Sequence, residues 1–564
     1  MSLHNSKNKI LISFFKEHYV LFVISFISGL FFNLLTLLIP IAIGKFYELI
    51  FGFRSHKLKI FEHFSIFQTE NFNTFFWIFV FLIITRLVLD FINKYVIGLS
   101  GEVFSKELRE TLFEKQLHID LPEYEEKGVG KYLLRFSGDM KSVQNYLTRG
   151  VLRFSQDIML ILILLVGISI LNWKVALIIV IGFTVVFGVL MLLNKVVYRI
   201  STQHRDSKSG LLSFVNIRLR AVSSIKAFNK FSPEIKRFNA RSEKIYGLGN
   251  KFQQITSIIY AIIPAGTYLV VGSILFFVYY YKQEMGYGSL LALILIIMSF
   301  LPVFRRVLRV GVVWQTGNIS FAKLFRVFDL GKKDSNLKDD LEFIESIGFK
   351  SVDFSYGSGK ELILNKASVQ FEGKGIYLIK GNHGAGKSTV VKLLLSLYKP
   401  KNGELLINSK IASSFSEFSI RKHITVVSSS FPLYGKDAYE SIVYARNEKR
   451  KVKATQLLIE LQKHVPEKSK ITIDYNIGEL GANLTQAQKM LLMYCRALMS
   501  NKKVLLVDEG YYGFNSKTKA LITDKLNRLS KSKIIIVLGT SFPDKMNIKR
   551  RYTLEKGVFA LINS

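Results

Sequence analysis

The most informative stretch of this sequence is Gly381-Asn382-His383-Gly384-Ala385-Gly386-Lys387-Ser388-Thr389. An apolar run with strand character, Ile376–Ile379, precedes it, and an apolar segment that can continue as a helix, Val390–Leu395, follows it. Strand, glycine-rich loop, Lys-Ser pair and helix in this order are typical of a phosphate-binding loop, whose backbone N–H groups and helix N-terminus hold phosphate oxygens. We therefore expect Lys387 to contact the β- and γ-phosphates of a nucleotide and Ser388 to ligate Mg²⁺. The alternative, a chance glycine-rich turn, is disfavoured because all four parts are in register.

The composition indicates a membrane protein. The 564 residues are enough for about two to four domains, 49% of them are apolar, and the mean hydropathy is +0.26. The formal net charge of +35 first suggests a nucleic-acid partner. Cytoplasmic loops of membrane proteins also collect Lys and Arg, so we predict no nucleic-acid partner. The single cysteine, Cys495, excludes an internal disulfide and cysteine-based metal sites.

Six hydrophobic segments are candidates for membrane helices. The first, Tyr19–Gly44, has 26 residues without a charge. It is too long for the core of a signal peptide and lacks a small-residue cleavage site, so we expect a retained membrane helix. The other five are predicted near residues 74–97, 158–173, 175–194, 255–281 and 288–304. The segment Asn172–Lys174 leaves room only for a tight turn between the third and fourth spans.

The charge pattern predicts how the chain is organised. Basic residues are dense in the N-terminal tail and in the long connections after the second and fourth spans, which places these parts in the cytoplasm. Apolar residues at helical spacing predict that the long connections extend the membrane helices. We expect four parts, which are a tail at 1–16, a transmembrane domain at 17–318, a linker at 319–341 and an α/β domain at 342–564, where short strands alternate with helices.

Six spans with long cytoplasmic helices, followed by a phosphate-loop domain, resemble an exporter-type half-transporter of the ATP-binding cassette (ABC) superfamily. The resemblance covers nearly the whole chain, and two cytoplasmic segments also carry it. Gly128–Asp139 resembles the family's Gly, Arg and Asp pattern, and Val222–Phe228 resembles its Ile-Lys-aromatic segment. The implied fold is a multi-domain membrane protein with a six-helix all-α transmembrane domain and a C-terminal α/β P-loop ATPase domain.

The resemblance also implies a function. ATP and Mg²⁺ would be bound by the C-terminal domain, and coupling helices near Asp139 and Ser213 would transmit its movement to the membrane domain. A substrate would be exported by ATP-driven alternating access in the plasma membrane, in bacteria the inner membrane, with the N-terminus and the ATPase domain in the cytoplasm. The implied partner is a second half-transporter.

Two carboxylates end a predicted buried strand at Val504–Glu509. Asp508 is expected to hold Mg²⁺, directly or through water, because this cation prefers oxygen ligands. Glu509 is expected to orient or deprotonate the water that attacks the γ-phosphate. The alternative is an ordinary strand end with exposed acids. The resemblance further implies that Tyr356 stacks on adenine, although a lone aromatic residue in a strand is more often part of the core.

Several residues depart from the family pattern. The signature Leu-Ser-Gly-Gly-Gln is replaced by Leu484-Thr485-Gln486-Ala487-Gln488. Gln486 and Ala487 place side chains where two glycines would let the backbone approach a γ-phosphate. Three further positions differ. Ser429 replaces the family's Mg²⁺-contacting glutamine, Gly539-Thr540 replaces a histidine, and Asn515 replaces an aspartate.

These departures predict a chain that binds ATP but hydrolyses it weakly or only with a partner. Losing one transition-state donor commonly costs about 10²–10³ in rate. A heterodimer in which the partner supplies an intact signature would complete the site around Lys387. The alternative is a homodimer with two impaired sites.

Charges inside the predicted spans suggest structural or substrate contacts. Arg86 and Asp90 lie four residues apart and are expected to pair on one helix face, with a substrate contact as the alternative. Arg305, Arg306 and Arg309 either snorkel to the inner headgroups or line a cavity for an anionic cargo, such as an acidic peptide or a lipid phosphate. The histidines are scattered without metal-ligand spacing.

Two further function classes are alternatives to this interpretation. In the first, the cassette binds ATP as a ligand and the membrane part gates or chaperones a partner without transporting anything. In the second, a soluble cassette ATPase acts on DNA or the ribosome, which conflicts with the six hydrophobic spans.

Overall fold

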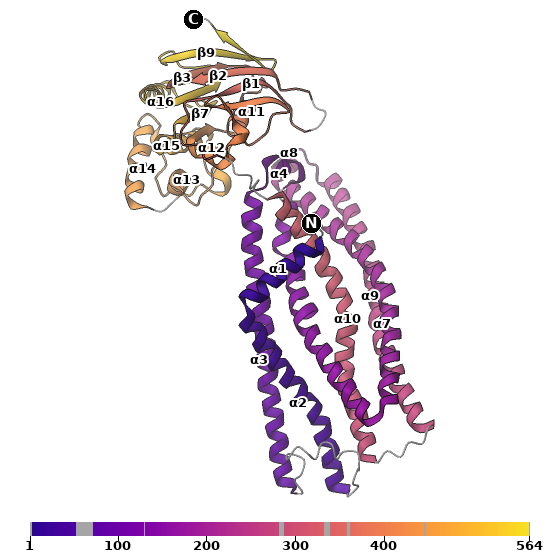
Figure 1. Ribbon diagram of the computed structural model, residues 1–564. Coiled ribbons are helices and arrows are strands. Elements are labelled where there is room, and N and C mark those ends of the chain that lie inside the picture. The colour runs from indigo at the N-terminus through magenta and orange to yellow at the C-terminus, as the bar shows by residue number, and fades with distance from the viewer. Residues whose placement is uncertain are drawn as a thin grey trace. The chain divides into compact units, whose positions relative to one another are not determined.

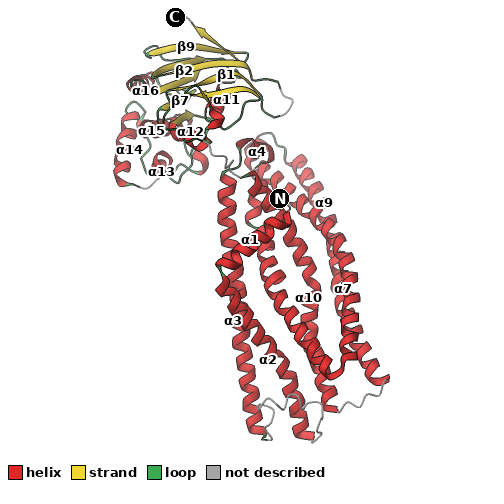
Figure 2. Cartoon of the chain, viewed as in Figure 1, coloured by secondary structure: helices red, strands yellow, loops and turns green. Residues whose placement is uncertain are grey.

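The computed structural model describes residues 3–51, 71–128, 130–280, 287–331, 339–357, 361–444 and 447–562. The chain divides into two compact units. The first comprises Met1–Ile119 and Glu123–Lys333, and the second comprises Asp120–Pro122 and Asp334–Ser564. The first unit is helical, and all strands of the described residues belong to the second unit (Figure 2).

The described part of the chain up to Leu330 is built from helices, five of which have 33 to 67 residues (Figure 1). Helices of this length exceed the roughly 20 residues that span a bilayer. The elements are α1 Leu3–Glu17, α2 Tyr19–Phe51, α3 Phe72–Leu117, α4 Leu121–Lys127, α5 Gly130–Leu133, η3 Leu134–Phe136, α6 Gly138–Asn145, η4 Tyr146–Arg153, α7 Phe154–Arg220, α8 Val222–Ala227, α9 Phe231–Tyr280 and α10 Tyr287–Leu330.

Four described segments are long and apolar enough to cross a membrane, namely Tyr19–Thr36, Phe72–Leu117, Trp173–Arg220 and Phe231–Phe277. They coincide with the first, second, fourth and fifth predicted spans, although residue 281 of the fifth lies outside the described residues. The third predicted span lies in the first part of α7. The sixth lies in α10, where most of its side chains fall outside the description.

Helix α7 folds back on itself at the turn predicted around residues 172–174. Helical structure continues from Phe154 to Arg220, yet Leu164 and Ile179 line the same small cavity. In a straight helix these two residues would be separated by about 22 Å. The predicted third and fourth spans therefore pack against each other within one continuous helical element.

The N-terminal segment predicted as a polar tail is the helix α1. Leu11 and Phe14 are buried, and the buried Lys7 donates through Nζ to Tyr146 Oη at 3.1 Å and to Asn318 Oδ1 at 3.0 Å. The lysines made this segment look polar throughout, although its buried residues lie at helical spacing. The helix is tied to the bundle by both apolar and polar contacts.

Helix α10 continues through the first part of the segment predicted as a linker. Phe321, Leu324 and Val327 are buried in the same apolar cluster as the residues of α1, so this stretch is held as a helix by packing. Residues 332–338 of the predicted linker lie outside the described residues.

A buried polar network joins α2, α3 and α7. Gln156 Nε2 donates to the Ser25 carbonyl at 2.8 Å and to Asn93 Oδ1 at 3.0 Å, while Gln156 Oε1 accepts from Asn93 Nδ2 at 3.1 Å. Asn33 Nδ2 donates to the Gln156 carbonyl at 3.1 Å. A Cβ atom at Gly29 would lie 2.5 Å from the Gln156 side chain, so a glycine is needed for α2 to approach this closely.

The predicted pair between Arg86 and Asp90 is not formed. Asp90 Oδ2 instead accepts from Lys94 Nζ at 2.6 Å, while Arg86 donates through Nε to Thr36 Oγ1 at 3.3 Å and lies over the Phe32 ring. Asp90 has two cations at helical spacing, one on either side, and sequence spacing alone could not distinguish them. Arg86 links α3 to α2.

The second unit contains two sheets. The four-stranded antiparallel sheet has the order β2-β1-β4-β5, and the six-stranded sheet has the order β10-β9-β3-β8-β7-β6 and is parallel except for β10. The strands are β1 Ser346–Phe354, β2 Leu364–Glu372, β3 Gly375–Lys380, β4 Asn402–Ile407, β5 Lys410–Ile411, β6 Ile424–Ser428, β7 Val504–Asp508, β8 Ile534–Gly539, β9 Ile548–Glu555 and β10 Val558–Ile562.

The parallel strand β7 is buried on both faces. Val504 and Leu506 contribute to one apolar cluster, and Leu505 and Val507 contribute to another, which explains why the strand reads as an unbroken apolar run. The helices of this unit are α11 Lys387–Leu394, η5 Ala412–Ser414, α12 Glu417–His423, α13 Ala438–Val443, α14 Glu448–Leu461, η6 Glu467–Ser469, η7 Glu479–Gly481, α15 Gln486–Met499 and α16 Ser516–Leu529.

We expect Gln156→Ala to destabilise the helical unit, because it removes the hydrogen-bond partners of Asn93 and Ser25. Leaving such buried groups unpaired costs about 1–3 kcal/mol. The check is the apparent thermal unfolding midpoint of the detergent-solubilised protein. Gln253→Ala is the control, because Gln253 is exposed on α9. Equal midpoints for the two variants would contradict a stabilising role for the network.

Candidate nucleotide-binding site

The carboxyl ends of four parallel strands meet at one edge of the larger sheet. The register pairs Lys380 of β3 with Gly539 of β8, Leu538 of β8 with Asp508 of β7, and Asp508 with Ser428 of β6. Residues that follow these strands are therefore brought together although they are far apart in the sequence. The predicted phosphate-binding loop follows β3 at this edge.

The loop between β3 and α11 depends on glycine. Gly384 and Gly386 have φ angles of 83° and 95°, in the left-handed region that favours glycine. A Cβ atom at Gly386 would lie 2.9 Å from the side chain of Ile363. The Gly381 N–H donates to the Gly539 carbonyl at 3.2 Å, which fixes the start of the loop to β8.

Lys387 is buried at the first position of α11. Its Nζ donates to the carbonyls of Gly381 and Asn382 at 2.8 and 2.9 Å, and it lies 3.2 Å from Glu509 Oε1. The ammonium group is thus held inside the loop, beside the end of β7. The other predicted loop residues, His383, Ala385 and Thr389, lie in the same turn and in the first turn of the helix.

Asp508 is the most enclosed carboxylate of the site, with 2% exposure. Its Oδ2 accepts from Ser388 Oγ at 2.7 Å and from Ser428 Oγ at 3.0 Å, whereas its Oδ1 is buried without a hydrogen-bond partner among the described residues. Burial raises the pKa of Asp508, while the two serine hydroxyls oppose this effect. An unpaired carboxylate oxygen beside a serine hydroxyl fits the oxygen ligands that Mg²⁺ requires.

Glu509 has an unusual backbone conformation, and its carboxylate lies beside Lys387 of the loop. Its φ angle of 51° lies in the left-handed region, which is unfavourable for a side chain larger than glycine. The Glu509 N–H donates to the Leu538 carbonyl at 2.9 Å and so holds this conformation. The side chain is partly exposed, while Oε1, which faces Lys387 Nζ, is buried.

Tyr356 lies beside the first turn of α11. Its hydroxyl is 3.2 Å from Thr389 Oγ1, and its ring packs edge-on against Phe354 and Tyr398 at centroid distances of 5.1 and 5.2 Å. Lys392 Nζ lies 5.2 Å from the ring centroid. The ring is half-buried at the border of the core, so stacking on adenine stays a prediction.

The segment in the signature position has a local structural role. Thr485 caps α15, and its side chain and that of Gln488 form a reciprocal capping box. Gln488 Nε2 also donates to the Ser469 carbonyl at 2.8 Å. Leu484 is buried, while Gln486 and Ala487 occupy the first turn, half-buried. Among the described residues, no hydrogen bond joins this segment to the loop or to Asp508.

Asn515, another departure from the family pattern, also has structural partners. Asn515 caps α16 by accepting from the Thr518 N–H at 2.8 Å, and it donates through Nδ2 to the His464 carbonyl at 2.8 Å. Ser429 is exposed. Its neighbour Ser428 contacts Asp508 together with Ser388. Ser428 was not identified from the sequence. The only signal was its place at the end of an apolar run that pairs with β7.

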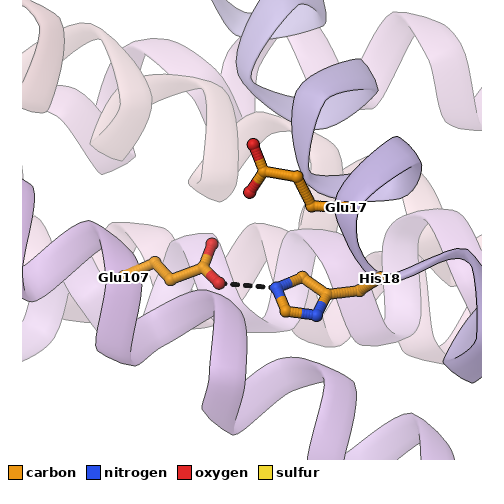
Figure 3. Close-up of side chains that lie close together, drawn as sticks. All are labelled: Glu17, His18 and Glu107. Atoms are coloured by element: carbon orange, nitrogen blue, oxygen red, sulfur yellow. Dashed lines mark hydrogen bonds and ion pairs between the residues drawn. The ribbon is translucent and has the colours of Figure 1, made fainter.

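A second polar cluster, in the first unit, was also missed. His18 follows α1, and its Nε2 lies 2.6 Å from Glu107 Oε1 of α3, with Glu17 alongside (Figure 3). One ligand atom from each of the three residues lies within 4.8 Å of the others. Linear spacing predicted no such grouping, because Glu107 is brought in by helix packing. The contact fastens the end of α1 to α3.

Comparison with known proteins agrees with this architecture. The model of the ABC transporter transmembrane region matches residues 22–303, and the ABC transporter model matches residues 364–511. An export ATP-binding/permease protein of Rickettsia typhi is 25% identical over 81% of each chain. The ATP-dependent lipid A-core flippase of Haemophilus influenzae is 24% identical over 81% of this chain and 79% of its own.

A solved bacterial Atm1-family ABC exporter with ATP bound has a TM-score of 0.81 to this chain, at 18% identity, and covers 95% of this chain and 94% of its own. That likeness confirms the fold. The helical membrane region fused to a phosphate-loop domain places the chain in the class of ATP-dependent membrane transporters. Within that class, the chain belongs to the ABC transporter family, with the exporter-type arrangement of a membrane region followed by a cassette.

We expect Ser428→Ala to shift the pH dependence of Mg²⁺-dependent nucleotide binding. Removing the hydroxyl removes a hydrogen bond that favours the Asp508 carboxylate, so the already raised pKa of Asp508 rises further. Because Mg²⁺ needs the carboxylate form, binding should be lost at a higher pH than in the unmodified protein. The measurement is fluorescent ATP-analogue binding across the acidic range at fixed Mg²⁺.

Ser429→Ala serves as the matched control for this experiment, because Ser429 is the exposed neighbour of Ser428. Its profile should coincide with that of the unmodified protein. A shift in Ser429→Ala without one in Ser428→Ala would contradict the assignment of the serine that supports Asp508.

Proposed function

We propose that this chain is an ATP-driven export half-transporter whose own capacity for hydrolysis is weak or depends on a partner subunit. The convergence of Lys387, Ser388, Asp508 and Glu509 at one sheet edge carries the proposal. The fused membrane helices and the exporter relatives support it. The proposed location is the bacterial inner membrane, with the N-terminus and the cassette in the cytoplasm.

We assign a different role in nucleotide binding or hydrolysis to each of these residues. The loop N–H groups and Lys387 would hold the phosphates, and the Lys387–Glu509 ion pair would separate as the γ-phosphate takes over the ammonium group. Ser388 and Asp508 would hold Mg²⁺, which neutralises charge on the phosphate oxygens. Glu509, released from Lys387, would be free to orient or deprotonate the attacking water.

The proposal of weak hydrolysis is supported by residues that differ from the family pattern at positions expected to contact nucleotide. Gln486 and Ala487 stand where glycines would admit a phosphate, and Thr485 already uses its hydroxyl in the capping box. Ser429 is a short side chain at the position of a glutamine, and Gly539-Thr540 offers no imidazole. Binding of ATP depends on the loop, whereas the rate of hydrolysis depends on the altered positions.

We expect the purified chain alone to hydrolyse ATP slowly while binding it tightly. The deficit relative to a site with all contacts should be about 10²-fold or more, since one lost donor commonly accounts for that factor. Steady-state ATPase activity in detergent or nanodiscs measures it, with Glu509→Gln as the catalytic control and Lys387→Ala as the binding control. Robust turnover abolished by Glu509→Gln would show that the altered positions are dispensable.

A partner subunit is the second element of the proposal. In ABC dimers the cassettes hold nucleotide between the loop of one subunit and the signature of the other, so an intact signature from a partner would restore the site around Lys387. Identification of the subunits in the purified membrane complex tests this directly. A complex that contains only this polypeptide would contradict the heterodimer and support a homodimer.

An anionic cargo is the third element, and the structure distinguishes the three arginines predicted to contact it. Arg306 forms a bidentate pair with Asp157, at 2.7 and 3.1 Å. Arg305 and Arg309 instead lie over the rings of Tyr268 and Tyr260 on α9, at 5.3 and 4.8 Å.

Arg305 Nε is buried without a hydrogen-bond partner among the described residues. We assign Arg305 and Arg309 to the anionic part of the cargo, an acidic peptide or a lipid phosphate. The flippase relative, named for lipid A-core, supports the lipid class.

We expect Arg305→Ala and Arg309→Ala to weaken the binding of anionic cargo by about tenfold each, the loss of one charge-assisted hydrogen bond. Equilibrium binding of a labelled acidic peptide and of a labelled phospholipid, measured without ATP, keeps the result independent of hydrolysis. Arg306→Lys, which retains a cation beside Asp157, is the matched control. Unchanged affinity of both alanine variants for both probes would contradict the assignment.

A further inference from the structure

A cavity of about 650 Å³ lies in the first unit, between the ends of α7, α9 and α10 and the short helix α5. Its volume falls within the range of about 300–1,000 Å³ that small-molecule sites occupy. It belongs entirely to the part of the chain that precedes the cassette. None of the residues assigned above to nucleotide or cargo lines it.

The wall of this cavity is strongly cationic. Five cations and one carboxylate line it, namely Arg135, Arg218, Arg241, Lys323, Arg326 and Asp206. Three of these cations already have carboxylate partners. Arg135 is bound to Asp139, Arg218 donates to Glu234 at 2.8 Å, and Lys323 lies 3.1 Å from Asp206.

Two guanidinium groups, those of Arg241 and Arg326, remain without a carboxylate partner within the described residues. Arg241 stacks over the Phe214 ring at 4.7 Å, which positions it by packing and leaves its N–H donors available. Both side chains are exposed and line the same cavity, and like charges that share a cavity repel one another unless an anion offsets them. An unbalanced pair on a cavity wall is therefore an anion-binding arrangement, and the planar fork of a guanidinium group matches phosphate oxygens.

A buried hydroxyl adds an independent indication of a ligand. Ser209 of α7 lines the cavity with 7% exposure, and its Oγ has no hydrogen-bond partner among the described residues. A serine in a helix usually bonds back to a carbonyl of the preceding turn, as Thr202 does on the same helix. An unpaired buried hydroxyl on the cavity wall is a donor without an acceptor.

Part of the remaining wall is apolar. Phe214, Ile217, Val327 and Leu330 border the cavity, so the space suits a ligand with a charged end and an uncharged body. Inorganic ions alone would leave most of the volume unused. The wall therefore favours a phosphorylated organic molecule over a simple salt ion.

We propose that this cavity is a regulatory binding site for a phosphate-bearing ligand, whose phosphate is held by Arg241, Arg326 and the Ser209 hydroxyl. The ligand is either a soluble phosphorylated metabolite or a phospholipid headgroup, which share this chemistry. Because the cavity joins α7, α9 and α10, an occupant would tie together helices that continue into the membrane. It would stabilise one arrangement of the bundle over others.

The test measures pyrophosphate binding to the full-length protein in nanodiscs by isothermal titration calorimetry. All variants carry Lys387→Ala, so that the phosphate loop of the cassette contributes no signal. We expect saturable binding that weakens about tenfold or more in Arg241→Gln/Arg326→Gln, as the loss of charge-assisted hydrogen bonds predicts. Ser209→Ala should weaken it by a smaller factor. Lys244→Gln, an exposed cation on α9 outside the cavity, should leave it unchanged.

A second arm distinguishes the two sources of phosphate. Nanodiscs containing phosphatidic acid should compete with pyrophosphate if the headgroup enters the cavity, and neutral phosphatidylcholine nanodiscs should show no competition. Competition assigns the lipid source, and undiminished pyrophosphate binding assigns the soluble source. The proposal is overturned if pyrophosphate does not bind, or if the Arg241/Arg326 double variant binds it as well as the Lys244→Gln control does.

Discussion

The second unit is organised around one electrostatic constraint, the burial of Asp508 at the end of a strand that is itself buried on both faces. A carboxylate in that position loses its hydration, so its charge must be balanced by neighbouring groups. Ser388 and Ser428 both donate to Oδ2, whereas Oδ1 is buried without a hydrogen-bond partner among the described residues. The loop, β6 and β7 are thereby fixed to one another at the point where phosphate would bind.

The contiguous features of this architecture could be predicted from the sequence, because a strand, a glycine loop and a helix follow one another in the chain. Contacts between segments that are far apart in the sequence could not be predicted in this way. Ser428 meets Asp508 through strand register, and His18 meets Glu107 through helix packing, so neither pair leaves a linear signal. Helix α1 was predicted as a tail for a related reason, since its lysines masked the few buried positions that decide its packing.

Several residues at or beside the positions that depart from the family pattern have a local structural task. Thr485 and Gln488 cap α15, Asn515 caps α16, and the Gly539 carbonyl fixes the start of the phosphate loop. Helix caps stabilise by about 1 kcal/mol each and need no bound ligand. These contacts stabilise the fold of the cassette independently of nucleotide.

The large positive charge of the chain divides into cations that hold the structure together and cations that remain available. Arg306 is bound to Asp157, and Arg135 to Asp139, where the carboxylates lie between packed helices. Removing one partner of such a pair would leave a buried charge uncompensated. Arg241 and Arg326 lack such partners among the described residues and share a cavity wall. The position of the carboxylates, rather than the total charge, thus determines where this membrane unit can attract an anion.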